Sequence, residues 1–159
     1  MTSGAIEKVR IFAYLNKELT QQNPSLTEPF YIPLNPENYS KTFKIETDNR
    51  RGHGNQGTDP RYTSTVPEEL KLEFILDGTG SIENYVYKDM SVKDQFDLFL
   101  KTVYRMEGKI HRPNFLKVYW GKYLKFPCIL SGLDVNYQLF ESSGDPLRIK
   151  LTATFLSYL

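Results

Sequence analysis

Two long segments near the end of the chain alternate between apolar and polar residues with a period of two. They span Leu124–Phe140 and Leu147–Leu159, and the polar segment Glu141–Pro146 joins them. A period of two is the spacing of a strand that buries one face, and Gly and Pro are typical of the turn between two strands. The pattern therefore predicts a long β-hairpin. One face of this hairpin carries Val135, Tyr137 and Leu139 opposite Ile149, Leu151, Ala153 and Phe155.

Shorter runs with the composition of strands precede this hairpin. Polar or Pro-containing segments such as Asn35–Asn38 separate them, as expected for turns. β-branched and aromatic residues, which fit half-buried pleated surfaces, are frequent in these runs. We expect strands at Ile6–Tyr14, Phe30–Leu34, Tyr39–Ile45, Leu70–Leu76 and Phe115–Trp120.

One segment, Ser91–Met106, has the pattern of an amphipathic helix. Ser91 and Asp94 form a variant of the capping box at its start, and Gly108 is expected to end it. Its apolar residues form a single stripe, which consists of Val92, Phe96, Phe99, Leu100, Val103 and Met106. The strands and this helix predict a mainly β (α+β) fold, a barrel or sandwich of about seven or eight strands with one packed α-helix, in a single domain over residues 1–159.

Composition and charge exclude several classes of protein. The chain has 20 basic and 19 acidic residues, a formal net charge of +1, which is too balanced for an electrostatic nucleic-acid footprint. The first residues lack the features of a signal peptide, and no apolar run approaches the roughly 18 residues of a membrane helix. We therefore expect synthesis and assembly in the cytoplasm, without membrane insertion. Aromatic residues make up 14%, a share that favours β structure and protein interfaces.

Several motifs suggest chemistry but lack the context that the chemistry needs. Gly52, Gly54 and Gly57 match a dinucleotide fingerprint, yet no buried strand precedes them and no helix pattern follows. Asp77-Gly78-Thr79-Gly80 resembles an aspartic-protease motif, but the extra glycine breaks its spacing and no second copy supplies a partner carboxylate. A turn after a strand explains the second motif better.

Histidine and cysteine provide no recognisable site. His53 and His111 are the only histidines, and neither has a ligand at zinc-site spacing. Cys128 is the only cysteine, and its apolar neighbours predict a buried residue rather than a nucleophile. We therefore expect no enzymatic activity, no cofactor and no metal.

Four segments together resemble a known family. They are Leu34–Ser40, Pro67–Gly80, His111–Gly121 and the final hairpin with its Pro146-Leu147-Arg148 motif. In this order, over nearly the whole chain, they resemble the tube-type proteins of contractile injection systems. The resemblance implies a tail-tube-like fold, in which strands of neighbouring subunits join into a larger barrel around a lumen.

The resemblance also implies a place in a phage-tail-like particle, which is released from the cell or anchored at a membrane. We expect a homo-hexameric ring in the baseplate that adapts the spike hub protein to the inner tube protein and contacts other baseplate subunits. Many relatives carry a LysM peptidoglycan-binding module after this domain. This sequence stops at Leu159, so cell-wall binding is not expected. Three roles remain open: a hub adaptor, a tube-initiating ring and a tube subunit. It is also open whether the sequence is a trimmed form of a longer chain.

Residues 48–65 form the longest segment without periodicity, and we expect a flexible loop there. Its arginines, flanked by acidic residues, are weak evidence for nucleic-acid binding and favour contact with a partner protein. Under the resemblance, this loop would order against the next ring. The hypothetical inter-subunit contacts in it are Arg50, Arg51, His53, Arg61 and Tyr62.

Two questions stay open at the level of sequence. The competing class is a small ligand-binding or enzymatic β-barrel, which would need polar residues converging inside the barrel; a monomeric surface-binding module is a third possibility. The strand that would carry the joining edge of a ring is also open. Lys41–Thr47 and Lys71–Ile75 are the candidate segments for it.

The loop generates a first prediction. We expect Asp48–Thr65 to be disordered in the isolated subunit and ordered in the assembly, because glycines and charges without periodicity bury too little apolar surface to order the chain alone. Hydrogen exchange of these amides should be rapid in the subunit and slow in assembled material. Strong protection in the free subunit would contradict the prediction.

Overall fold

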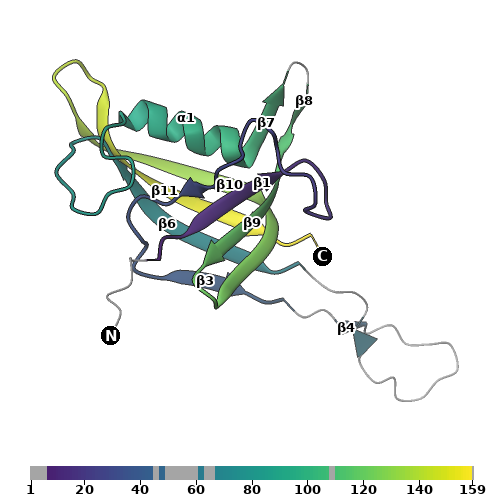
Figure 1. Ribbon diagram of the computed structural model, residues 1–159. Coiled ribbons are helices and arrows are strands. Elements are labelled where there is room, and N and C mark those ends of the chain that lie inside the picture. The colour runs from purple at the N-terminus through teal and green to yellow at the C-terminus, as the bar shows by residue number, and fades with distance from the viewer. Residues whose placement is uncertain (1–6, 45–46, 49–60, 63–66, 108–109, 159) are drawn as a thin grey trace, which may run out of the picture.

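The computed structural model describes residues 7–44, 47–48, 61–62, 67–107 and 110–158. These residues form one helix and a series of strands, shown in Figure 1. The elements are β1 (Arg10–Tyr14), β2 (Phe30–Tyr31), β3 (Tyr39–Thr42), β4 (Thr47–Asp48), β5 (Arg61–Tyr62), β6 (Glu69–Asp77), α1 (Val92–Val103), β7 (Tyr104–Glu107), β8 (Ile110–Pro113), β9 (Phe115–Trp120), β10 (Leu124–Phe140) and β11 (Pro146–Leu156).

Seven strands make one antiparallel sheet, in the order β2-β1-β9-β10-β11-β6-β3. Two small ladders, β4 with β5 and β7 with β8, stand apart from it. The prediction of a mainly β fold with one packed helix is confirmed. In the described part of the chain the end strands β2 and β3 do not pair, so the sheet is open and not a closed barrel.

β10 divides the sheet into two halves. Its first five residues, Leu124–Cys128, pair with β9, whereas Ile129–Phe140 pair with β11 on the opposite edge. We call β2, β1, β9 and the start of β10 the first half-sheet, and the rest of β10 with β11, β6 and β3 the second half-sheet. The sheet curls so far that Tyr39 on β3 packs against Trp120 on β9, with ring centroids 5.8 Å apart.

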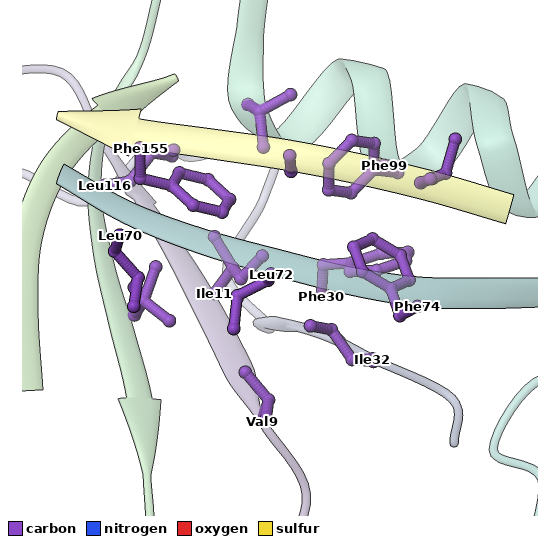
Figure 2. Packing of buried hydrophobic residues seen from close by; sticks show 14 of the residues in the cluster. Val9, Ile11, Phe30, Ile32, Leu70, Leu72, Phe74, Phe99, Leu116 and Phe155 are labelled. Atoms are coloured by element: carbon purple, nitrogen blue, oxygen red, sulfur yellow. The ribbon is translucent and has the colours of Figure 1, made fainter. Parts of the chain in front are cut away.

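The core fills the space inside this curl. Residues at every second position of the long strands are buried, such as Leu70, Leu72, Phe74 and Leu76 on β6. The two half-sheets and α1 all contribute to one cluster, part of which is shown in Figure 2. Period-two alternation thus explains the core, because it places one apolar row of each strand on the concave side.

α1 lies across the open side of the curl (Figure 1) and packs mainly on β11, β7, β1 and β6. The predicted cap is confirmed, since the Ser91 side chain accepts a hydrogen bond of 3.1 Å from the Asp94 backbone N–H. The predicted end is wrong. The helix stops at Val103, and Tyr104–Glu107 continue as β7 instead of running on through Met106. Thr102, Val103 and Tyr104 all favour strands, which explains the early end.

The predicted hairpin of β10 and β11 is confirmed, and its register shifts at three places, after Leu130, Tyr137 and Leu139. Val135 pairs with Leu151 and Tyr137 with Ile149, in the expected period. A bulge after Tyr137 then shifts the register, so that Leu139 pairs with Arg148. Some earlier strands are shorter than expected: β1 starts at Arg10, β2 ends at Tyr31 and β3 ends at Thr42.

Phe99 offers a test of the packing. Its side chain is fully buried and contacts the rings of Phe30 and Phe74 at centroid distances of 5.3 and 5.5 Å. Replacing it with alanine removes these contacts and leaves a cavity, so Phe99→Ala should lower the free energy of unfolding by about 3–5 kcal/mol. Chemical denaturation measures this change, and a loss under about 1 kcal/mol would show that Phe99 is not core.

Candidate functional site

The predicted contact residues fall at the margin of the described chain. Arg61 and Tyr62 form β5, which pairs with Thr47 and Asp48 of β4. Arg50, Arg51 and His53 lie outside the described residues, as does most of the predicted loop. The structure therefore places the described residues at the two ends of the predicted loop side by side. That the loop forms an interface with another subunit stays a prediction.

Those residues considered for chemistry that the structure describes are not gathered into a site. His111 lies exposed on β8, and Cys128 is fully buried on β10. Burial raises the pKa of the Cys128 thiol well above its ordinary value, which disfavours the reactive thiolate. In the portion of the chain that the structure describes, no three His, Cys, Asp or Glu side chains are placed to hold a metal, and no helix is long and apolar enough to cross a membrane.

The open strand edges are the most distinctive feature of the molecule. β3 ends the second half-sheet and has only β6 beside it among the described residues. At the other side of this half-sheet, Ile129–Phe140 of β10 pair with β11 alone, because β9 stops pairing at Cys128. The four strands of the second half-sheet therefore lie between two open edges. The other candidate edge, Lys71–Ile75, is wrong because β6 lies inside the sheet.

Exposed apolar side chains lie on or beside the same two strands. Six large apolar side chains are exposed in the described part of the chain, and four of them belong to this group. They are Phe43, next to β3 and 62% exposed, and Tyr137, Leu139 and Phe140 on β10, which are 53%, 43% and 55% exposed. Open backbone donors and acceptors next to exposed apolar side chains are the features of a surface that another chain covers.

The hairpin of β10 and β11 extends past the start of α1 (Figure 1). A groove of about 470 Å³ lies at its base, lined among others by Phe96, Tyr137 and Leu147. At the tip, the Glu141 N–H donates to the Asp145 carbonyl at 2.8 Å, and Gly144 adopts a positive φ of 93° that closes the turn. The hairpin is thus a formed, protruding element and not a loose loop.

A buried polar network fixes the direction of this hairpin. The Asp77 carboxylate at the end of β6 accepts a hydrogen bond of 2.8 Å from Nε of Arg148, which lies near the start of β11. Nε2 of Gln95, fully buried on α1, donates to the Asp77 carbonyl at 2.9 Å. The Tyr85 hydroxyl donates to the Gln95 side chain and accepts from the Asp77 N–H. The network therefore joins α1, β6 and the base of the hairpin.

The network is a feature that the sequence patterns did not indicate. Gln95 is not one of the apolar residues of the predicted stripe, yet it is fully buried on α1. Its partners Asp77 and Tyr85 are distant in sequence, so no local pattern reports the contact. The one local signal was the turn motif after Asp77, where the Thr79 N–H donates to the carboxylate at 2.8 Å.

The fold and the open edges define a class of protein: an antiparallel β protein whose sheet leaves strand edges unpaired among the described residues. Comparison with families of known proteins matches residues 5–159 to the contractile injection system tube protein family. The chain belongs to this family, so the resemblance seen in the sequence is confirmed, and the protein is a structural subunit of a contractile injection system particle. A search of curated proteins finds no match.

The network yields a prediction about acid stability. Burial raises the pKa of Asp77, but hydrogen bonds from Thr79 and Arg148 outweigh burial and hold it below its ordinary value. An ionisable group whose pKa is lower in the folded than in the unfolded state stabilises the fold at pH values above its unfolded pKa. This stabilisation is lost as the pH falls through the folded pKa. We expect Asp77→Asn to lower stability by about 1–2 kcal/mol at neutral pH. It should also reduce the loss of stability that occurs as the pH falls below about 4.

Urea denaturation across this pH range measures both effects. Glu73→Gln is a matched control, because it removes a carboxylate whose 2.8 Å pair with Lys150 is exposed. We expect the control to change stability by less than about 0.5 kcal/mol. Equal effects of the two substitutions would contradict the role of Asp77.

Proposed function

We propose that this protein forms a closed hexameric ring in the baseplate, which joins the spike hub to the inner tube. The observation that carries this proposal is the pair of open edges on the second half-sheet, together with the apolar side chains exposed beside them. Membership of the tube family supports it as well. The ring would close through heterologous contacts, in which β3 of one copy lies beside β10 of the next.

The direction of the strands supports this contact. Each neighbouring pair in the second half-sheet is antiparallel, and the half-sheet has four strands, so β3 and β10 run in opposite directions. Rotation about a ring axis leaves the direction of each strand relative to the axis unchanged. β3 of one copy would therefore meet β10 of the next as another antiparallel pair, and one regular ladder would continue around the ring.

The side chains on these strands support the same contact. Tyr39 and Lys41 of β3 pair with the buried Leu72 and Leu70, so they belong to the core side of the sheet. Phe43 continues that row, and Tyr137 lies on the core side of β10 opposite Ile149. Edge-to-edge pairing would bring Phe43 of one copy toward the apolar row of β10 in the next and remove both from water.

Contacts above and below the ring would use other parts of the chain. The proposed contacts with neighbouring rings or baseplate subunits are Arg50, Arg51, His53, Arg61 and Tyr62, in the segment predicted to order on assembly. The spike hub and the inner tube protein are the proposed partners on either side. A ligand-binding barrel finds no support, because the interior of the curled sheet is filled with buried apolar side chains.

Proline substitutions test the strand contact. Successive N–H groups of a strand point to opposite edges, and proline removes one of them. Prolines scanned through residues 40–42 and 133–136 should therefore alternate in effect. At every second position the backbone N–H points away from the strand that pairs with it in the same subunit. A proline at such a position should leave the subunit folded, as measured by circular dichroism, but prevent the formation of rings, as seen by electron microscopy. If every folded variant still forms rings, strand pairing does not close the ring.

Electron microscopy of particles purified from the producing cells tests the place of the ring. We expect density for six copies between the spike hub and the inner tube. Density for this chain along the whole tube would contradict the baseplate assignment, and so would absence of the chain from the particle. Neither result would test the contact between β3 and β10, which the proline scan tests separately.

A further inference from the structure

The outer face of the first half-sheet combines cations with aromatic rings. Arg10 and Lys125 flank Tyr119 on the neighbouring strands, as register partners on β1 and β10. Phe12 and Pro127 flank Lys117 in the same way. All six are accessible, at least in part, on the side opposite the buried Ile11, Leu116 and Val118. We call Arg10, Phe12, Lys117, Tyr119 and Lys125 the basic face.

The positive charges of the basic face have no carboxylate partners among the described residues. In the described part of the chain none of Arg10, Lys117 and Lys125 makes an ion pair, and no strand position on this face carries Asp or Glu. Nε of Arg10 is buried and has no hydrogen-bond acceptor among the described residues. A donor in this state costs free energy unless a further group accepts its hydrogen bond.

The second half-sheet gives a contrast within the same molecule. On its outer side Lys150 pairs with Glu73 at 2.8 Å, and at its edge Lys41 pairs with Glu68 at 3.4 Å. These two cations are balanced by carboxylates of the same chain. The chain as a whole is nearly neutral, with 20 basic and 19 acidic residues, so the unbalanced basic face is a local feature and not a result of excess charge.

Aromatic contacts hold the cations in place. The Arg10 guanidinium lies 5.6 Å and the Lys117 ammonium 5.1 Å from the centroid of the Tyr119 ring, and the Phe12 ring meets Tyr119 edge-on at 5.6 Å. Such contacts order the side chains but leave their N–H donors unused. They also occupy the Tyr119 ring, which is then a poor platform for stacking a base. A surface with ordered cations, but without an aromatic ring on which a base could stack, favours carboxylates over nucleic acid as the ligand.

We propose that the basic face binds a carboxylate-bearing segment of a different protein of the particle. The inference rests on the proposed ring, because closure through β3 and β10 uses only the second half-sheet and leaves this face uncovered by ring neighbours. Aspartate or glutamate side chains of the partner would accept hydrogen bonds from Lys117, Lys125 and Arg10, and the surrounding rings would exclude water from these pairs.

Zero-length carbodiimide coupling tests this chemistry directly, since it joins a lysine to a carboxylate only where the two are in contact. Particles purified from the producing cells would be treated and digested, and the coupled peptides identified by mass spectrometry. Lys150–Glu73 and Lys93–Asp97, both paired at 2.8 Å, are internal positive controls. We expect Lys117 or Lys125 to couple to an Asp or Glu of another protein in particles, and to remain uncoupled in the isolated subunit.

Three results would overturn the proposal. One is coupling of both control pairs without coupling of Lys117 or Lys125. Another is coupling of these lysines to a second copy, for example to Glu141 or Asp145 of the hairpin tip. The third is that nuclease treatment of the particles makes Lys117 and Lys125 newly accessible to acetylation, which would identify a nucleic acid. Absence of the chain from the particles would instead refute the proposed function.

Charge variants separate this contact from ring formation. Lys117→Gln with Lys125→Gln should still form rings by electron microscopy, but the amount of the coupled partner in the particles should fall at least about fivefold. Lys117→Arg with Lys125→Arg keeps the charges and should retain the partner. Lys71→Gln with Lys88→Gln, at two exposed lysines away from this face, makes the same change in net charge and should also retain it. Equal loss from both glutamine pairs would overturn the proposal.

Discussion

The architecture depends on the unequal sharing of β10 between its two neighbours. β9 pairs with only the first five residues, Leu124–Cys128, and β11 pairs with the remainder, so neither edge of β10 is paired over its whole length. This arrangement lets one strand leave the first half-sheet and enter the second, which curls the sheet around the core. The same arrangement leaves a long open edge beside the hairpin. Core formation and the open edge that we propose as a joining surface therefore have one structural origin.

Local periodicity predicted much of this fold. β10 begins and ends at the predicted residues, and the Ser91 cap marked the start of α1 correctly. These features depend on contacts within a few residues or on a repeating face. The end of α1 was missed because Gly108 was given more weight than the strand-favouring residues Thr102–Tyr104. The open edges and the basic face were out of reach, since they depend on which strands pair, and pairing joins residues far apart in sequence.

The buried network of Asp77, Tyr85 and Gln95 connects the core to the hairpin that carries the proposed joining edge. Gln95 lies on α1, Asp77 ends β6, and Arg148 starts the return strand of the hairpin. In the proposed ring the hairpin meets a neighbour in one register, and a fixed base favours this contact because less conformational freedom is lost on binding. A polar network specifies one arrangement more strictly than apolar packing does, since each donor must find its acceptor. This explains why a glutamine is fully buried on the core side of α1, beside Val92, Phe99, Thr102 and Val103.

An open edge is also a risk, since any exposed strand can pair with it. The hairpin limits this risk by its irregular register, with shifts after Leu130, Tyr137 and Leu139. A bulge interrupts the regular alternation of donors and acceptors and turns the strand, so only a partner with a matching short ladder fits. β3 has four residues, Tyr39–Thr42, and is short enough to pair between two such irregularities. The bulges therefore favour one specific short partner over unspecific edge-to-edge aggregation.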